Sequence, residues 1–202
     1  MALFTNTGDE CVIRNLKLVN SYMTTKGSSG VASFTVNGAG TLEKLYSDAI
    51  IDHQGDRVAG IASRNDRNMT INECWFDGVI NSSRTQIGGI VDIITKGNTV
   101  INHSLFSGTI NSTFTTNDTD KEGVFIGGIC GTVKPPTSVK SNVGVKIIDC
   151  LSSGEINTKC NIYSGSVIGY VMYGGNSSVS FRDSYTIEGI ANAAYGATTG
   201  SI

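Results

Sequence analysis

The chain has 202 residues, with 15 Lys and Arg, 17 Asp and Glu and 2 His, so its formal net charge is −2. This balance gives no basic surface of the kind that binds duplex nucleic acid, and no apolar run approaches the roughly 20 residues of a membrane-spanning helix. The chain contains 25 Gly and only 2 Pro. Together with many Ile, Val, Thr and Asn, this composition is typical of strands joined by turns.

A short motif recurs along the chain about every 30 residues. Its copies are, in chain order, Cys11–Asn20, Thr41–Ile51, Thr70–Ile80, Val100–Ile110, Lys146–Ile156 and Ser180–Ile190. The first apolar residues of the copies, at positions 13, 42, 71, 101, 147 and 181, are separated by 29, 29, 30, 46 and 34 residues. A recurring period of this length is typical of repeat proteins.

A second marker, a Gly followed by an apolar residue, recurs out of phase with the first. Its five instances are Gly30-Val31, Gly60-Ile61, Gly89-Ile90, Gly128-Ile129 and Gly169-Tyr170. Their spacings of 30, 29, 39 and 41 residues have the same underlying period. We therefore expect the five pairs to occupy equivalent positions.

Each repeat of about 30 residues contains three short apolar stretches separated by turns. In the repeat that ends with the motif Val100–Ile110 these are Ile87–Ile94, Thr99–Phe106 and Thr109–Ile110, and none is long enough for an amphipathic helix. The pattern predicts an all-β fold, a β-solenoid of five to six coils of about 30 residues with loop insertions in the fourth coil. In this interpretation residues 1–202 form a single solenoid domain, in which each strand pairs with its equivalent one coil away.

Equivalent side chains are expected to stack in register along such a solenoid. Ile71, Ile101 and Ile147 are predicted to form one inward column. Because Asn and Asp tolerate turns and hydrogen-bond locally, the residues that follow the closing Ile of four copies are predicted to form a ladder at one corner. These residues are Asp52, Asn81, Asn111 and Asn157.

Two parts of the repeat resemble the GLUG-motif repeats of bacterial surface proteins. The matching residues are Gly88–Ile90 and Gly127–Ile129, which read Gly-Gly-Ile, and the longer motifs Ile71–Ile80, Ile101–Ile110 and Ile147–Ile156. Such repeats occur in adhesin-like proteins and in the non-catalytic region of some IgA-cleaving metallopeptidases. The resemblance implies a right-handed, parallel β-helix-like solenoid with a scaffold or binding role outside the cell, and it implies no catalytic residues.

The chain departs from such surface proteins at its beginning. It starts directly in repeat-like sequence, Ala2-Leu3-Phe4, and no basic region is followed by an apolar one, as in a secretion signal. We therefore expect a segment of a longer extracellular or cell-surface protein, while an intracellular location stays open. The ends of the solenoid are expected to be covered by further solenoid sequence or by another subunit.

Charged residues give two further places for chemistry. The stretch Asp48–Arg67 contains four Asp, three Arg and His53, and it is either a solvated turn or the carboxylate face of a carbohydrate-active enzyme. One register position carries the column Asn15, Lys44, Glu73, His103, Asp149 and Asp183. Stacking would put His103 between Glu73 and Asp149, where it is either a bend residue or a group that gains a proton or binds a metal.

The insertions of the fourth coil are the predicted binding loops, because loops on rigid scaffolds commonly carry recognition. Asp118, Asp120 and Glu122 resemble the first half of a calcium-binding loop that lacks the final Glu. Calcium is thus the one cofactor that the sequence suggests. Lys134 and Lys140 lie in the second insertion, and they complete the set of candidate binding residues.

The five Cys are predicted to have a structural role. Cys11, Cys74, Cys130, Cys150 and Cys160 lie far apart, and no two of them form a CxxC pair of the kind found in zinc sites. We expect them to be small apolar residues of the core.

The sequence therefore predicts a non-enzymatic scaffold or adhesion segment of a bacterial cell-surface protein. Its expected partner is a protein or glycan ligand, bound through exposed loops or a flat solenoid face. Nucleic acid is not an expected partner, and no transmembrane segment is expected. Two alternatives stay open: a β-helix enzyme that acts on carbohydrate, as a polysaccharide lyase or hydrolase, and a structural repeat subunit of a filament.

Overall fold

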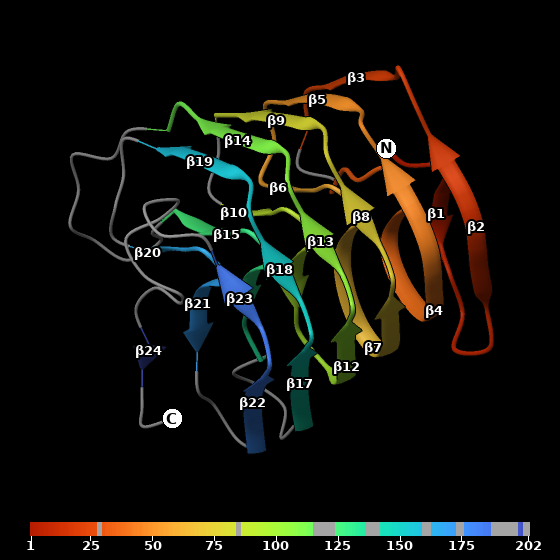
Figure 1. Ribbon diagram of the computed structural model, residues 1–202, viewed down its shortest axis with the longest axis vertical. Helices are drawn as coiled ribbons and strands as arrows, with labels where there is room; N and C mark the ends of the chain where they lie inside the picture. Colours follow the sequence, from red (N-terminus) through yellow and green to blue (C-terminus); the bar gives the residue numbers. More distant parts are fainter. Residues whose placement is uncertain are drawn as a thin grey trace.

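The computed structural model of the chain is built from parallel strands (Figure 1). It describes residues 1–27, 30–83, 86–114, 124–135, 142–158, 163–172, 176–186 and 198–199. These residues contain 24 strands and no helix, and the pairings between the strands are parallel. The all-β part of the prediction is confirmed.

The strands form three sheets. The largest has 15 strands: β1 (Phe4–Asn6), β2 (Val12–Leu18), β4 (Thr35–Ser47), β7 (Ala62–Asn72), β8 (Trp75–Phe76), β11 (Val91–Ile94), β12 (Gly97–Asn102), β13 (Leu105–Phe106), β16 (Cys130–Val133), β17 (Asn142–Ile148), β18 (Leu151–Ser152), β21 (Ile168–Met172), β22 (Asn176–Arg182), β23 (Tyr185–Thr186) and β24 (Thr198–Thr199). The second has four: β6 (Arg57–Ala59), β10 (Gln86–Gly88), β15 (Phe125–Gly127) and β20 (Tyr163–Gly165). The third has five: β3 (Tyr22–Thr25), β5 (Ile50–His53), β9 (Val79–Ser82), β14 (Thr109–Ser112) and β19 (Glu155–Thr158).

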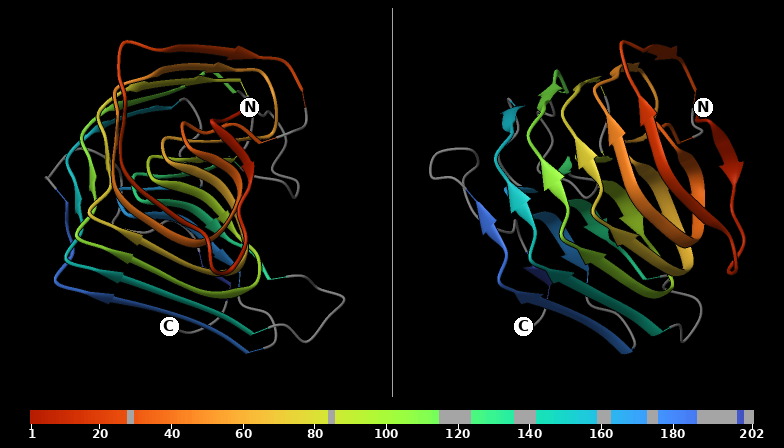
Figure 2. Two further views of the ribbon diagram at one scale, coloured as in Figure 1. Left: turned by 90° about the vertical axis from the view of Figure 1, so that its right-hand side faces the viewer. Right: turned by 45° about the vertical axis from the view of Figure 1, so that its right-hand side comes forward.

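Successive copies of the repeat lie side by side in the molecule. In Figure 1 they run from the red and orange N-terminal strands on the right to the blue C-terminal strands on the left, and the left view of Figure 2 shows them one behind another around a curled cross-section. The first apolar residues of the copies pair in series: Ile13 with Leu42, Leu42 with Ile71, Ile71 with Ile101, Ile101 with Ile147 and Ile147 with Phe181. The register of the largest sheet therefore follows the repeat in the sequence, including its 46-residue interval.

This column of paired residues lies at the centre of the core. Leu42, Ile71, Ile101 and Ile147 are fully buried. Phe181 is 40% exposed, because β22 pairs only with β17 among the described strands. Burial of each such side chain stabilises the fold by about 1.5–3 kcal/mol, and each needs its neighbour in the next copy to be covered.

Large and small side chains are matched within each copy. Phe76 and Phe106 stack, with ring centroids 6.4 Å apart and ring planes 7° apart. A Cβ atom added to Gly60 would lie 2.2 Å from the ring of Phe76, so this position requires glycine. In the preceding copy Ser47 takes the place of Phe76, and its hydroxyl is hydrogen-bonded to that of Ser33 at 2.7 Å. Phe76 thus faces Gly60, whereas Ser47 faces Ser33.

The second sequence marker is correct for three copies and wrong for two. Main-chain hydrogen bonds join residue 34 to 61, 61 to 90, 90 to 129 and 129 to 167. The equivalents of Gly60-Ile61 are therefore Ser33-Phe34 and Ser166-Val167, rather than Gly30-Val31 and Gly169-Tyr170.

Both misassigned positions require glycine because of contacts with neighbouring residues. A Cβ atom on Gly30 would lie 2.2 Å from the hydroxyl oxygen of Ser63, and one on Gly169 would lie 2.6 Å from the main chain of Ile126. These close contacts are unrelated to the contact between glycine and phenylalanine that recurs in the repeat.

Replacement of Gly89 by Ala is expected to destabilise the fold by about 1–3 kcal/mol, the usual cost of forcing an extra methyl group into a packed core. The new Cβ would lie 2.1 Å from the carbonyl oxygen of Gly128 and 2.5 Å from the ring of Phe106. Urea unfolding measures the loss. Gly8→Ala is the matched control, because no atom lies within 4 Å of its added Cβ; equal effects of the two substitutions would contradict the packing described here.

Candidate functional site

A bend with left-handed backbone conformation recurs in six copies. Its residues have φ between 47° and 57° and are Asn15, Lys44, Glu73, His103, Asp149 and Asp183, the six that the sequence placed in one column. At each bend the alternation of inward and outward side chains shifts by one residue. Ile71 and Cys74, three positions apart, are therefore both buried, and Trp75 faces outward.

The side chains of this column form ion pairs at the surface. Lys44 Nζ lies 4.0 Å from Glu73 Oε2, and His103 Nε2 lies 3.3 Å from Asp149 Oδ2. The structure thus brings His103 to Asp149 but gives it no ion pair with Glu73. Within the described ranges no group of three or more His, Cys, Asp and Glu side chains is arranged to hold a metal ion. Because exposed pairs contribute only about 0–1 kcal/mol, the column acts mainly through its backbone.

The second residue after each bend belongs to an outward row, which we call the aromatic row. It consists of Lys17, Tyr46, Trp75, Leu105, Leu151 and Tyr185, each paired with the next across β2, β4, β8, β13, β18 and β23. Trp75 is 41% exposed and Tyr185 is 65% exposed, whereas the flanking Cys74 and Phe76 are buried. The structure therefore presents a continuous line of large, mostly apolar side chains on its surface.

The rings of the aromatic row are held by one another. Tyr46 and Trp75 meet edge to face, with ring centroids 5.0 Å apart and planes at 72°. Lys17 Nζ lies 5.9 Å from the centroid of the Tyr46 ring, at the outer reach of a cation–π contact. These contacts restrain the orientations of the Tyr46 and Trp75 rings.

Polar groups line one side of the aromatic row. The indole N–H of Trp75 donates to Ser107 Oγ at 2.6 Å, and the Ser107 hydroxyl donates to Asp77 Oδ1 at 2.6 Å. Asp48 Oδ1 accepts the main-chain N–H of Asn20 at 2.7 Å. Burial, and then the charges of Asp48 and Asp77, raise the pKa of Tyr46. The row thus combines flat apolar rings with oriented acceptors.

Analysis of the sequence missed the aromatic row. In the four middle copies one outward residue lies between two buried ones, at positions 45–47, 74–76, 104–106 and 150–152. In five of the six copies the residue at this outward position is a large apolar or aromatic one. A search for recurring residue identity does not find such a position, because Lys, Tyr, Trp and Leu all occur there. A search for recurring size at an outward position would have found it.

The four residues of the predicted ladder lie at paired positions on β5, β9, β14 and β19. The side-chain amide of Asn81 donates to Asp52 at 2.6 Å, that of Asn111 to Asn81 at 2.9 Å, and that of Asn157 to Asn111 at 3.0 Å. The Tyr22 hydroxyl on β3 also donates to Asp52. The hydrogen bond from Tyr22, followed by that from Asn81, lowers the pKa of Asp52.

The charged stretch Asp48–Arg67 is distributed over several elements. Asp52 belongs to the ladder, and Asp66 Oδ2 lies 4.0 Å from Arg64. His53 is only 1% exposed, and burial lowers its pKa. Arg57 and Arg64 line a cavity that none of the ladder residues lines. The stretch is thus divided between structural contacts and that cavity.

Four of the five candidate loop residues lie outside the part of the chain that the structure describes. These residues are Asp118, Asp120, Glu122 and Lys140, so calcium binding stays a prediction. Lys134 follows β16, is half-buried, and its main-chain N–H donates to the carbonyl of Ile94 at 2.9 Å. It therefore continues the sheet.

The four Cys that the structure describes carry free thiols, at positions 11, 74, 130 and 150. Three are buried and Cys11 is half-buried. Burial raises the pKa of Cys74 to about 12 and that of Cys150 to about 11, so these thiols are protonated at neutral pH. Cys160 lies outside the described residues.

Comparison of the chain with protein-family models, with curated proteins and with solved structures gave no match. Among the described residues, no helix is long and apolar enough to cross a membrane.

Acid is expected to weaken the fold through Asp52. Its pKa is lowered from 3.8 in the folded state, so its stabilising effect is present above the pKa of the unfolded chain and is lost as the pH falls through the folded value. We therefore expect the wild-type chain to lose more stability than Asp52→Asn between about pH 5 and pH 3. Urea midpoints at each pH measure the difference, with the exposed turn variant Asp9→Asn as the control. Equal losses in the wild type and Asp52→Asn would contradict the prediction.

Proposed function

We propose that the chain is a β-solenoid scaffold that binds a glycan along the aromatic row, as an adhesion segment of a bacterial cell-surface protein. The in-register parallel pairing of six copies supports the solenoid, as does the bend that recurs in each copy. Each copy passes through the sheets in one order, for example from β9 to β10, β11, β12 and β13. A right-handed coil is the sense that crossovers between parallel strands strongly favour.

The observation that carries the binding function is the continuous exposed aromatic row. Contiguous apolar surface on a protein commonly marks an interaction site, and Trp and Tyr are the usual anchors of such sites. In the row, Tyr46 and Trp75 already hold each other at 5.0 Å. Binding would therefore cost little side-chain entropy.

The polar side of the row favours a glycan over an apolar protein segment. A sugar ring has an apolar C–H face, which packs on an aromatic ring, and an edge of hydroxyl groups, which need acceptors. Asp77 and Ser107 stand beside Trp75 with such acceptors. An apolar protein partner would instead bury the Asp48 and Asp77 carboxylates without replacing their water, which is costly. The same two negative charges favour a neutral glycan over an acidic one.

The role proposed for the row is binding rather than bond cleavage, because both nearby carboxylates already accept hydrogen bonds. Asp77 accepts one from the hydroxyl of Ser107, and Asp48 accepts one from the main-chain N–H of Asn20. The resemblance to GLUG-motif repeats supports a place outside the cell. Within the described strands β2 pairs only with β4, so its free edge suits further solenoid sequence or another subunit.

The test is binding to an array of neutral oligosaccharides, followed by calorimetry with the strongest ligand. Trp75→Ala is expected to weaken binding about tenfold or more, because an aromatic anchor commonly contributes about 2 kcal/mol. Tyr46→Ala removes the ring that orients Trp75 and is expected to weaken binding as well.

The control is Ile50→Ala, which removes an equally exposed apolar side chain, 43% exposed, from β5 in another sheet. It is expected to bind like the wild type. Absence of binding to every neutral glycan, or unchanged binding by Trp75→Ala, would overturn the proposal.

A further inference from the structure

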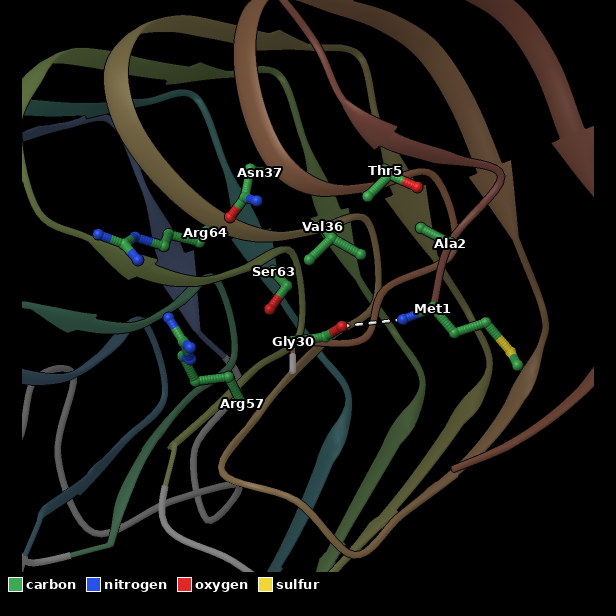
Figure 3. Close-up of a pocket in the computed structure, with 9 residues that line it drawn as sticks. All are labelled: Met1, Ala2, Thr5, Gly30, Val36, Asn37, Arg57, Ser63 and Arg64. Carbon is green, nitrogen blue, oxygen red and sulfur yellow. Dashed lines mark hydrogen bonds between the residues drawn. The ribbon is translucent and has the colours of Figure 1, made fainter. Parts of the chain in front are cut away.

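A separate cavity of about 420 Å³ lies among β1, β4, β6 and β7. Its polar lining consists of Thr5, Asn37, Ser63 and the side chains of Arg57 and Arg64. Figure 3 shows the two arginines on the side of the cavity away from Met1 and Ala2, with Ser63 and Asn37 between. The volume is within the range of small-molecule sites, about 300–1,000 Å³.

The register of the sheets shows that the two arginines are special to this copy. Arg57 pairs with Gln86, which pairs with Phe125 and then Tyr163. Arg64 pairs with Ile93, and the same row continues through residue 132 to Tyr170.

In the later copies these two rows close on each other with aromatic rings. The ring centroids of Phe125 and Tyr170 are 4.6 Å apart, and both residues are only 6% exposed. The second copy has the cavity in the place of this aromatic packing, with a guanidinium group from each row. Two like charges side by side are unfavourable unless an anion lies between them.

The protein itself supplies little negative charge to these arginines. Among the described residues Arg57 forms no ion pair, and the pair of Arg64 with Asp66 is long, at 4.0 Å. Asp92 interacts electrostatically with Arg57, but it forms no ion pair with it, is fully buried, and neither of its carboxyl oxygens has a hydrogen-bond partner among the described residues. Burial raises the pKa of Asp92 well above its ordinary value, and the charge of Arg57 acts in the opposite direction.

Two donors in the cavity wall also lack an acceptor. Ser63 is fully buried, and neither its hydroxyl nor the Nε–H of Arg64 has a hydrogen-bond partner within the described part of the chain. Buried donors without acceptors destabilise the folded state. A ligand that supplies acceptor oxygens at this point would satisfy both.

We propose that this cavity is a binding site for a small organic carboxylate that also carries hydroxyl groups, the chemistry of an acidic monosaccharide. The carboxylate lies between the guanidinium groups of Arg57 and Arg64, whose planar forks match its two oxygens. The hydroxyl of Ser63 and the amide of Asn37 bind the remaining polar groups. The site differs in charge and location from the aromatic row, which suits a neutral glycan.

The test is calorimetric titration of the whole chain with glucuronate, with glucose and sulfate as comparison ligands. Saturable binding of glucuronate is expected, with glucose binding undetectable and sulfate weaker. Arg57→Gln and Arg64→Gln are each expected to lower the glucuronate affinity about tenfold or more, since a hydrogen bond between charged groups contributes about 1.5–3 kcal/mol. Ser63→Ala, which changes no charge, is expected to weaken glucuronate binding more than sulfate binding.

Arg14→Gln, an exposed arginine on β2 outside the cavity, is the matched control, and thermal unfolding of each variant checks that it folds. Trp75→Ala is expected to leave glucuronate binding unchanged, so failure at this site is distinguishable from failure at the aromatic row. Absence of saturable glucuronate binding, equal affinity for glucose or sulfate, or full binding by both arginine variants would overturn the proposal. If one arginine variant does not fold, the other and Ser63→Ala decide the outcome.

Discussion

Register between parallel strands is the constraint on which the rest of this structure depends. Each copy of the repeat hydrogen-bonds to the next residue by residue, so Ile71, Ile101 and Ile147 share one environment although 30 and 46 residues separate them. A slip by one residue would turn every inward side chain of a copy outward. The left-handed bend residues set the same phase in each copy, because they shift the alternation of side chains at one fixed place. Whatever residue follows the bend by two positions must therefore face solvent.

Much of the fold could be predicted from the sequence because the same residue type recurs at inward and corner positions. The Ile column and the row of Asp52, Asn81, Asn111 and Asn157 were visible for this reason. The assignments of Gly30 and Gly169 were wrong because the same residue type occurs in different environments. Gly30 is required by its contact with Ser63, whereas the residue equivalent to Gly60 is Ser33, which faces the small Ser47. A glycine in the sequence indicates a close contact, but it does not indicate which neighbour makes that contact.

The candidate sites were harder to predict because they exist only between copies. A single exposed leucine or tryptophan is ordinary on a protein surface. Trp75 becomes part of a candidate site only because Tyr46 of the preceding copy packs against it. The cavity has the same origin. Arg57 and Arg64 stood out in the sequence as members of a charged stretch. The sequence does not show that the paired rows end in the packed rings of Phe125, Tyr163 and Tyr170, or that the buried Asp92 interacts electrostatically with Arg57. Pairing between strands of neighbouring copies, rather than proximity along the chain, creates both candidate sites.

In the proposed function, the composition of the aromatic row would set the length of glycan that the row holds. The paired rings of Tyr46 and Trp75 lie at one end of the row, and Tyr185 lies three strand spacings beyond Trp75, with Leu105 and Leu151 between. At about 4.8 Å per spacing, this separation is roughly 14 Å. A single sugar ring reaches only one of these anchors, whereas an extended oligosaccharide contacts both and crosses the leucines with its apolar faces. Since linked contacts raise affinity without any new type of interaction, the proposed binding of a glycan would select for chain length, and the rigidity of the row comes from the same register that holds the core.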